Sequence, residues 1–246
     1  ADTGPGEERL VYVAVGLAAL IVAPALGLTA AWHGWKGLQG RPSAPFRLAS
    51  WGWFASALIV ALGVGQAAFS AGIDALGLLA HLLVATLAAL LMLAVPVTVA
   101  RRRGWTVGRR AGATSLAWGG LGGIGLAVML ELIGIAVLVV AAALALAALR
   151  PELLEQLGGG TAWALTPDAG APAPLLGSPW VLAAGLLAIA VAAPVIEELC
   201  KGLAVPLVKL AGRPLARIDA FLLGAAAGAG FALMEGITNG ALALAQ

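Results

Sequence analysis

Six long apolar stretches, separated by shorter polar segments, divide the chain. Each has about 20 residues or more, which is the length that an α-helix needs to cross the hydrocarbon core of a bilayer. The pattern therefore predicts an all-α, polytopic transmembrane helical bundle of about six spans. They are expected at residues 10–32, 48–71, 76–100, 124–149, 180–210 and 218–245.

The polar segments predict how these spans are connected. Residues 33–47 are expected to form a loop, residues 72–74 a tight turn, and the Pro/Gly-rich residues 150–178 an outer loop. The glycine pairs at 119–120 and 122–123 are expected to break the stretch 114–149, leaving an interfacial segment before the fourth span. We therefore predict an N-terminal membrane region, 1–112, with three spans, and a membrane core, 113–246, with three spans and the 150–178 loop.

Composition supports a membrane protein. The chain is 61% hydrophobic and only 11% charged, whereas a soluble domain carries about 25% charged residues. The lipid bilayer is thus an expected partner and nucleic acid is not, since the net charge is only +2. If the amino terminus lies outside, 11 of the 14 Lys and Arg residues fall in inner segments, so the positive-inside rule predicts both termini outside. The single cysteine, Cys200, is expected to be small buried filler.

The fifth span carries an unusual group of charges, Glu197, Glu198 and Lys201, shortly after Pro194. A single charge in mid-membrane costs about 2.5 kcal/mol or more. On a helix, the i, i+3 and i, i+4 spacings place both carboxylates beside the amine. A structural ion pair is one interpretation, but two carboxylates exceed what one Lys neutralises, which favours a functional site. Pro194 is expected to loosen the helix where substrate or water enters.

The sixth span holds a third glutamate, Glu235, on one helical face with Phe231 and Asn239. The small residues 224–230 before it would let this helix approach a neighbour closely. At 1.5 Å per residue, Glu197 and Glu235 lie about 18 and about 21 Å from the inner edges of their spans. We therefore expect them to meet at one level, although a hydrogen-bonded packing role for Glu235 is the simpler alternative.

Two further ionisable residues, His81 and Glu131, lie in the third and fourth spans. Such residues are functional candidates by default, but we expect His81 to be a hydrogen-bonded core residue rather than a ligand. The adjacent glutamates suit the activation of water, since burial and like charge let one act as a base while another holds a proton. Lys201 would keep one of them ionised or stabilise developing negative charge. This is the chemistry of peptide-bond hydrolysis.

Two short motifs, Glu197-Glu198-x-x-Lys201 and Phe231-x-x-x-Glu235, resemble the first two signatures of the PrsW-type intramembrane proteases. That family belongs to the superfamily of CAAX proteases and bacteriocin-processing membrane enzymes. The resemblance implies an endopeptidase, in a bacterial inner (plasma) membrane, that cleaves a membrane-anchored protein substrate with glutamate-activated water. Glu197, Glu198, Lys201 and Glu235 would be catalytic, and Phe231, Asn239 and Pro194 would support the pocket. It also implies a divalent metal cofactor, with the glutamates as ligands or base, whose identity the sequence leaves open.

The sequence departs from the family pattern in one respect that bears on activity. A third signature, a His followed four residues later by a polar or acidic residue, is not found after Glu235, and neither His33 nor His81 matches it. Either the natural chain extends beyond Gln246 or a catalytic element is lost. The alternative function is therefore a catalytically incomplete accessory or assembly subunit of a larger membrane complex. A proton or ion pathway through Glu131 and the three other glutamates is the third hypothesis.

Overall fold

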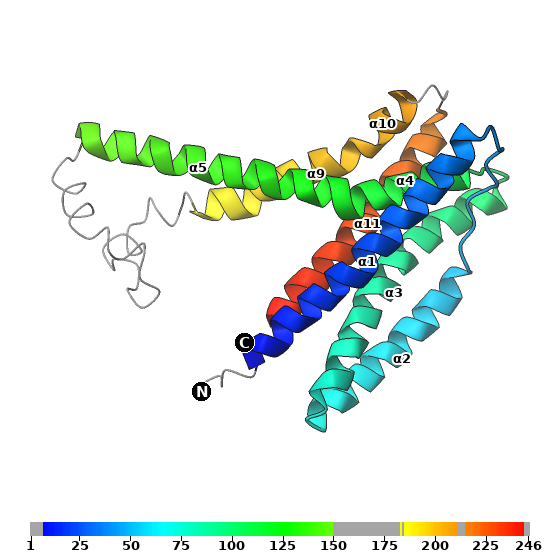
Figure 1. Cartoon of the computed structure of the whole chain (residues 1–246), viewed down its shortest axis with the longest axis horizontal. Helices are drawn as coiled ribbons and strands as arrows, with labels where there is room; N and C mark the ends of the chain where they lie inside the picture. The colour runs from blue at the N-terminus through cyan, green and yellow to red at the C-terminus, as the bar shows by residue number, and fades with distance from the viewer. Residues whose placement is uncertain (1–6, 150–182, 184, 211–214, 244–246) are drawn as a thin grey trace. The chain divides into compact units, whose positions relative to one another are not determined.

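A computed structural model describes residues 7–149, 183, 185–210 and 215–243 (Figure 1). All regular elements within these ranges are helices. Four of them are long and apolar enough to cross a membrane, namely Trp51–Ser70, Ala75–Arg102, Arg109–Ala141 and Arg217–Thr238. The chain is thus an all-helical integral membrane protein. Six spans and the outer location of both termini stay predictions, because only four candidate spans are found among the described residues and the expected span 180–210 is only partly described.

The chain divides into two compact units. Unit 1 comprises Ala1–Gly125 and Leu199–Gln246, and unit 2 comprises Leu126–Glu198. Unit 1 contains α1 (Glu7–Leu38), α2 (Trp51–Ser70), α3 (Asp74–Arg102), α4 (Arg109–Ala117), the π-helical segment η1 (Trp118–Gly123), α10 (Ala204–Leu210) and α11 (Arg217–Ala243). Unit 2 contains most of α5 (Ile124–Leu149), the π-helical segment η3 (Ala188–Ala192) and the first part of α9 (Ala193–Gly202).

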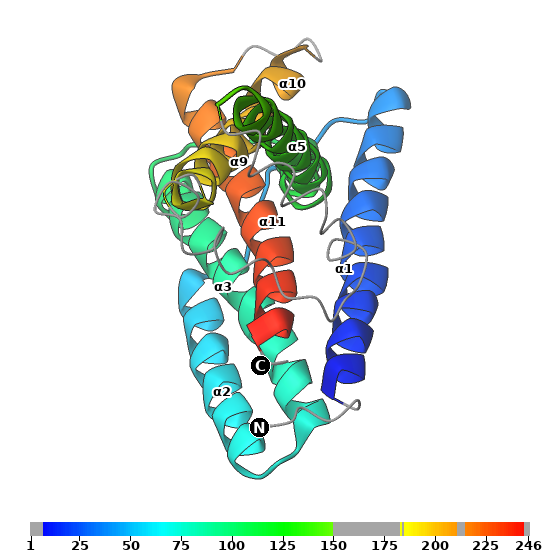
Figure 2. The same cartoon turned by 90° about the vertical axis from the view of Figure 1, so that its left-hand side faces the viewer.

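Helix α11 is the centre of unit 1. It contacts α1, α3, α4, η1 and α10, while α2 and α3 pair as neighbours, and Figures 1 and 2 both show α3 running beside α2 and α11. Half of the most apolar stretch of α11 is buried, against 22% or less in the other three candidate spans. Leu93 of α3 and Leu223 of α11 are fully buried in the larger core cluster. A second cluster joins Leu26 of α1, Ala89 of α3 and Leu233 of α11.

The glycine pairs do not break the helix, so that expectation was wrong. The chain is helical from Arg109 to Ala141, and residues 118–123 widen into the π-helix η1. These glycines allow close packing instead. A Cβ atom at Gly119 would collide with the carbonyl oxygen of Ala227 on α11, and one at Gly230 would collide with that of Leu116. The missing side chains let two backbones touch, which is the close approach predicted for residues 224–230.

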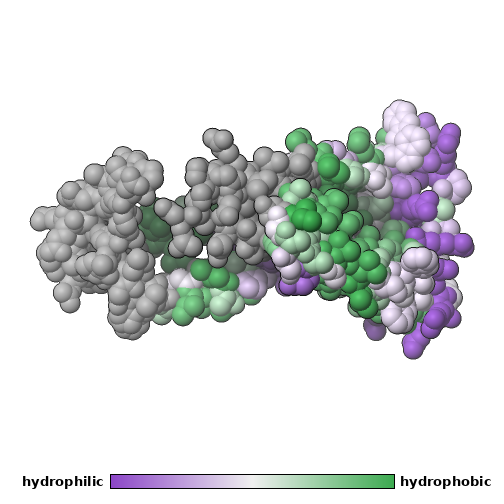
Figure 3. Space-filling model, turned by 90° about the horizontal axis from the view of Figure 1, so that it is seen from below, coloured by the Kyte–Doolittle hydropathy of each residue, from purple (hydrophilic) through white to green (hydrophobic). Residues whose placement is uncertain are grey.

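The cationic segments 33–47 and 101–110 meet at one end of unit 1. Residues 33–38 are helical and not a loop, because α1 continues to Leu38 and ends on Gly40, whose φ is +70°. The amides of Gly40 and Arg41 donate to Gly37 and Lys36, which caps the helix. The backbone bonds from Phe46 to Val107 and from Arg109 to Ala44 join the two segments. Figure 3 shows hydrophilic side chains gathered at this end.

The expected span 180–210 is interrupted within its described residues. Helix α9 ends at Gly202 and α10 begins at Ala204, with a turn at Leu203 between them. Pro206 gives the physical reason, since it has no amide hydrogen to donate to the carbonyl of Gly202 one turn earlier. The helix is therefore interrupted just after Lys201, so the straight-helix depth estimated for Glu197 stays a prediction.

Candidate functional site

Helix α9 carries the charged group of the first motif. Pro194 is the second residue of α9, which directly follows the π-helical segment η3, so its missing amide hydrogen removes one backbone hydrogen bond within a continuous helical stretch. Glu197 is half-buried and Glu198 is exposed, and Lys201 follows in the last turn on the expected i+3 and i+4 spacing. Cys200 is buried, with 1% of its surface exposed, as expected for filler. The helix thus presents two carboxylates and one amine within about one and a half turns.

Lys201 connects the first motif to the second. Its Nζ lies 4.2 Å from the centroid of the Phe231 ring on α11, which is a cation–π contact worth about 0.5–2 kcal/mol. Phe231 is only 3% exposed, so the ammonium rests on a rigid, buried ring. Glu235 follows one turn later on α11 and is half-buried. The fold therefore brings together Lys201 and Phe231, which are 30 positions apart in the sequence.

Trp118, which the sequence reasoning missed, holds the end of α9 in place. Its indole Nε1 donates a 3.0 Å hydrogen bond to the backbone carbonyl of Cys200, next to Lys201. Gly122 makes room for the ring, because a Cβ there would lie 2.6 Å from the Trp118 Cε3 atom. The only sequence signal for this role is a tryptophan next to two glycine pairs, which also fits an interface anchor.

His81 of α3 meets α11 beside Glu235. Its Nε2 lies 3.1 Å from the carbonyl oxygen of Gly236, and since a carbonyl only accepts, Nε2 carries the hydrogen. A Cβ atom at Gly236 would lie 3.3 Å from that of Ala85, one turn after His81, so the two helices pack closely here. The expectation of a hydrogen-bonded core histidine is confirmed.

Replacing His81 by Ala is expected to destabilise the protein by about 0.6–1.5 kcal/mol, the usual range for an interhelical or intramolecular hydrogen bond. The measurement is reversible unfolding in detergent. Thr86→Val is the matched control on the same helix, because the Thr86 hydroxyl bonds only within α3, to the carbonyl of Leu82. Equal stability of His81→Ala and the wild type would show that the contact with Gly236 contributes nothing.

The remaining candidates are not brought together by what is described. Glu197 and Glu198 belong to unit 2 and Glu235 to unit 1, so their meeting stays a prediction. The side chain of Asn239 lies outside the described residues, and Glu131 is half-buried on α5. Among the residues described, no group of three or more His, Cys, Asp and Glu side chains is arranged to hold a metal ion. Because the glutamates of the two motifs belong to different units, their fit to a metal ion stays a prediction.

The comparison with known protein families matches the same region of the chain. A family model described as PrsW family intramembrane metalloprotease matches residues 107–246, more than half of the chain. The match includes α4, η1, α9 and α11, which carry Trp118, both motifs and the glycine contacts. No curated protein and no solved structure matches the chain.

Proposed function

Because this chain belongs to the PrsW family of intramembrane metalloproteases, we propose that it hydrolyses a peptide bond of a membrane-anchored protein. The observation that carries the proposal is the contact between Lys201, the last residue of the first motif, and Phe231, the first residue of the second, both of which lie in unit 1. A purely structural ion pair between Lys201 and the glutamates would not require the Lys201 ammonium to contact the Phe231 ring of the second motif. The proposed location is a bacterial inner membrane. The lipid bilayer surrounds the protein there, and the substrate is anchored in the same membrane.

The chemistry is assigned to residues of this chain alone. A carboxylate of Glu197 or Glu198 takes a proton from water as the water oxygen attacks the scissile carbonyl carbon. The Lys201 ammonium stabilises the negative charge that develops on the carbonyl oxygen. The proton then passes to the amide nitrogen, the C–N bond breaks, and a carboxylate and an amine are left. Glu235 completes the polar pocket, and Phe231, Pro194 and Asn239 support it.

The test compares cells that natively express the protein with cells in which its gene is deleted. New amino termini in the membrane fraction are identified by terminal labelling and mass spectrometry. We expect at least one single-span membrane protein to be cut near or within its span only when the chain is present. Identical termini in the two strains would contradict a protease and would favour the accessory-subunit alternative.

A further inference from the structure

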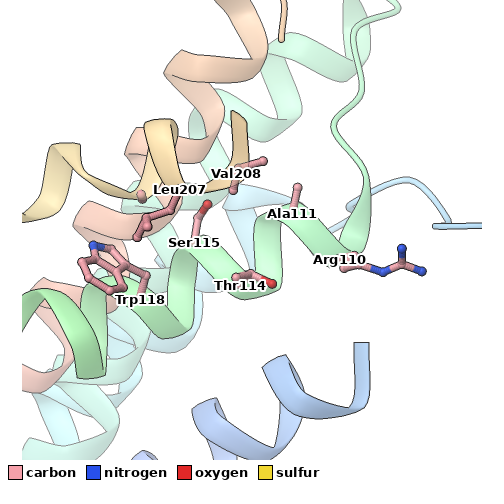
Figure 4. Close-up of a pocket in the computed structure, with 8 residues that line it drawn as sticks. Arg110, Ala111, Thr114, Ser115, Trp118, Leu207 and Val208 are labelled. Carbon is pink, nitrogen blue, oxygen red and sulfur yellow. The ribbon is translucent and has the colours of Figure 1, made fainter. Parts of the chain in front are cut away.

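A cavity of about 230 Å³ lies between α4, the start of η1 and α10, wholly within unit 1. Arg110, Ser115 and Trp118 line one side, and Leu207 and Val208 of α10 line the other (Figure 4). The lining is mostly apolar, with Arg110 at the end nearest the cationic loops. The proposed protease chemistry does not use this cavity.

Ser115 is the only buried polar residue among the described side chains whose oxygen has no hydrogen-bond partner there. It is 1% exposed, and Figure 4 shows its oxygen directed toward α10, near Leu207 and Val208. Serines and threonines in helices commonly donate to the carbonyl four residues earlier, as Ser70 and Thr86 do here. The Ser115 hydroxyl instead points into the cavity, where a ligand acceptor would satisfy it.

The end of the cavity next to Arg110 is strongly cationic. Arg109 and Lys209 directly adjoin the lining residues Arg110 and Val208 in the sequence, and both side chains are exposed. The Arg110 guanidinium donates to the carbonyls of His33 and Arg41 at 2.9 and 2.8 Å, which leaves further N–H donors of its five. Desolvation lowers the pKa of His33 below 6.5, and the charges of Arg109, Lys36 and Arg110 lower it further. This positive field favours an anion.

The position of Ser115 along its candidate span fits the dimensions of a phospholipid. Ser115 lies six residues into the candidate span that begins at Arg109, which is about 9 Å along the helix. The polar headgroup region of a leaflet is about 5–8 Å thick. Ester carbonyls, which accept hydrogen bonds, lie at the boundary between that region and the acyl chains. The cations, the hydroxyl and the apolar lining thus follow the order of phosphate, ester and tail.

We propose that this cavity binds one anionic phospholipid of the inner leaflet. Its phosphate lies in the field of Arg109, Arg110 and Lys209, an ester carbonyl accepts from the Ser115 hydroxyl, and the acyl chain packs against Leu207 and Val208. Leu207 is 44% exposed, so its side chain has room to move as the tail enters. Trp118 lines the cavity and also holds the carbonyl of Cys200, so the bound lipid steadies the end of α9.

Native mass spectrometry of the full chain in mild detergent tests the site. Phosphatidylglycerol and phosphatidylcholine with identical acyl chains are added at equal concentration. We expect the wild type to retain one phosphatidylglycerol in preference to phosphatidylcholine. Ser115→Leu, which fills the cavity, should lower that occupancy at least fivefold, and Leu207→Trp, which narrows it from the exposed side, should do the same if Ser115→Leu fails to fold. Ser70→Leu is the matched control and should bind normally.

Three results would overturn the proposal. Equal retention of the two lipids would remove the role of the cations. Normal binding by a folded Ser115→Leu or Leu207→Trp variant would place the lipid elsewhere. Displacement by soluble glycerol phosphate, which lacks the tails, would identify a phosphate site and not a lipid site.

Discussion

Of the two substitutions Glu197→Gln and Glu198→Gln, at least one is expected to lower the rate of substrate cleavage by about 100-fold or more. The reason is that an amide cannot take a proton from water. The two carboxylates differ in setting, since Glu197 is half-buried and Glu198 is exposed. We expect Glu198→Gln to abolish cleavage and to leave the fold intact. The rate is measured as the appearance of the new amino-terminal peptide after expression is induced.

Glu131→Gln provides the matched control for this experiment. Glu131 is also a half-buried glutamate within a candidate span, but it lies outside both motifs, so its variant should cleave at the wild-type rate. Unfolding temperatures of all variants show whether the fold is kept. Full activity of both Glu197→Gln and Glu198→Gln would refute the catalytic assignment. Equal loss in Glu131→Gln would show that the loss of cleavage is not specific to the glutamates of the first motif.

Replacing Gly119 or Gly230 by Ala is expected to destabilise unit 1 by about 3 kcal/mol or more, at or beyond the upper end of the usual range for overpacking. Each new methyl group would collide with a backbone carbonyl, of Ala227 or Leu116, and not with a side chain that can rotate away. Relief requires α11 to move away from α4 and η1. The measurement is unfolding in detergent, supported by the yield of folded protein.

Gly228→Ala and Gly125→Ala are the matched controls for these glycines. Nothing lies within 4 Å of a Cβ atom at either position, and Gly228 shares α11 with Gly230. Alanine is the better helix former, so both controls should be at least as stable as the wild type. If Gly230→Ala were as stable as Gly228→Ala, the backbone contact between α11 and η1 would not hold the fold together.

Local features of the sequence predicted the membrane class and most helix positions. The apolar runs 48–71, 76–100 and 218–245 correspond to α2 (Trp51–Ser70), α3 (Asp74–Arg102) and α11 (Arg217–Ala243). These are reliable because the thickness of the bilayer sets the length of an apolar helix whatever packs beside it. The motif spacings were equally local, and the family match to residues 107–246 agrees with them.

The glycine pairs show where such reasoning fails. A glycine both frees the backbone and permits close approach, and the sequence of residues 118–123 alone does not decide between the two. The presence of Ala227 and Gly230 on the facing helix decided it, since their backbone atoms occupy the space of the absent side chains. The end of α1 was misjudged because its cationic residues suggested a loop, while the cap at Gly40 comes later.

The sequence by itself determined that this protein lies in a membrane, that it is helical and which charged residues are candidates for the site. These properties depend on residue type and on spacings within a few helical turns. Only the tertiary structure decided which distant groups meet. Lys201 was expected beside glutamates and also contacts the Phe231 ring. His81 forms a hydrogen bond with the carbonyl oxygen of Gly236, 155 positions away in the sequence. Ser115 lies in a cavity between α4 and α10, and its hydroxyl has no hydrogen-bond partner among the described residues. Hydrogen bonds and ring contacts act over a few ångströms in space, and positions far apart in a sequence carry no signal of such closeness.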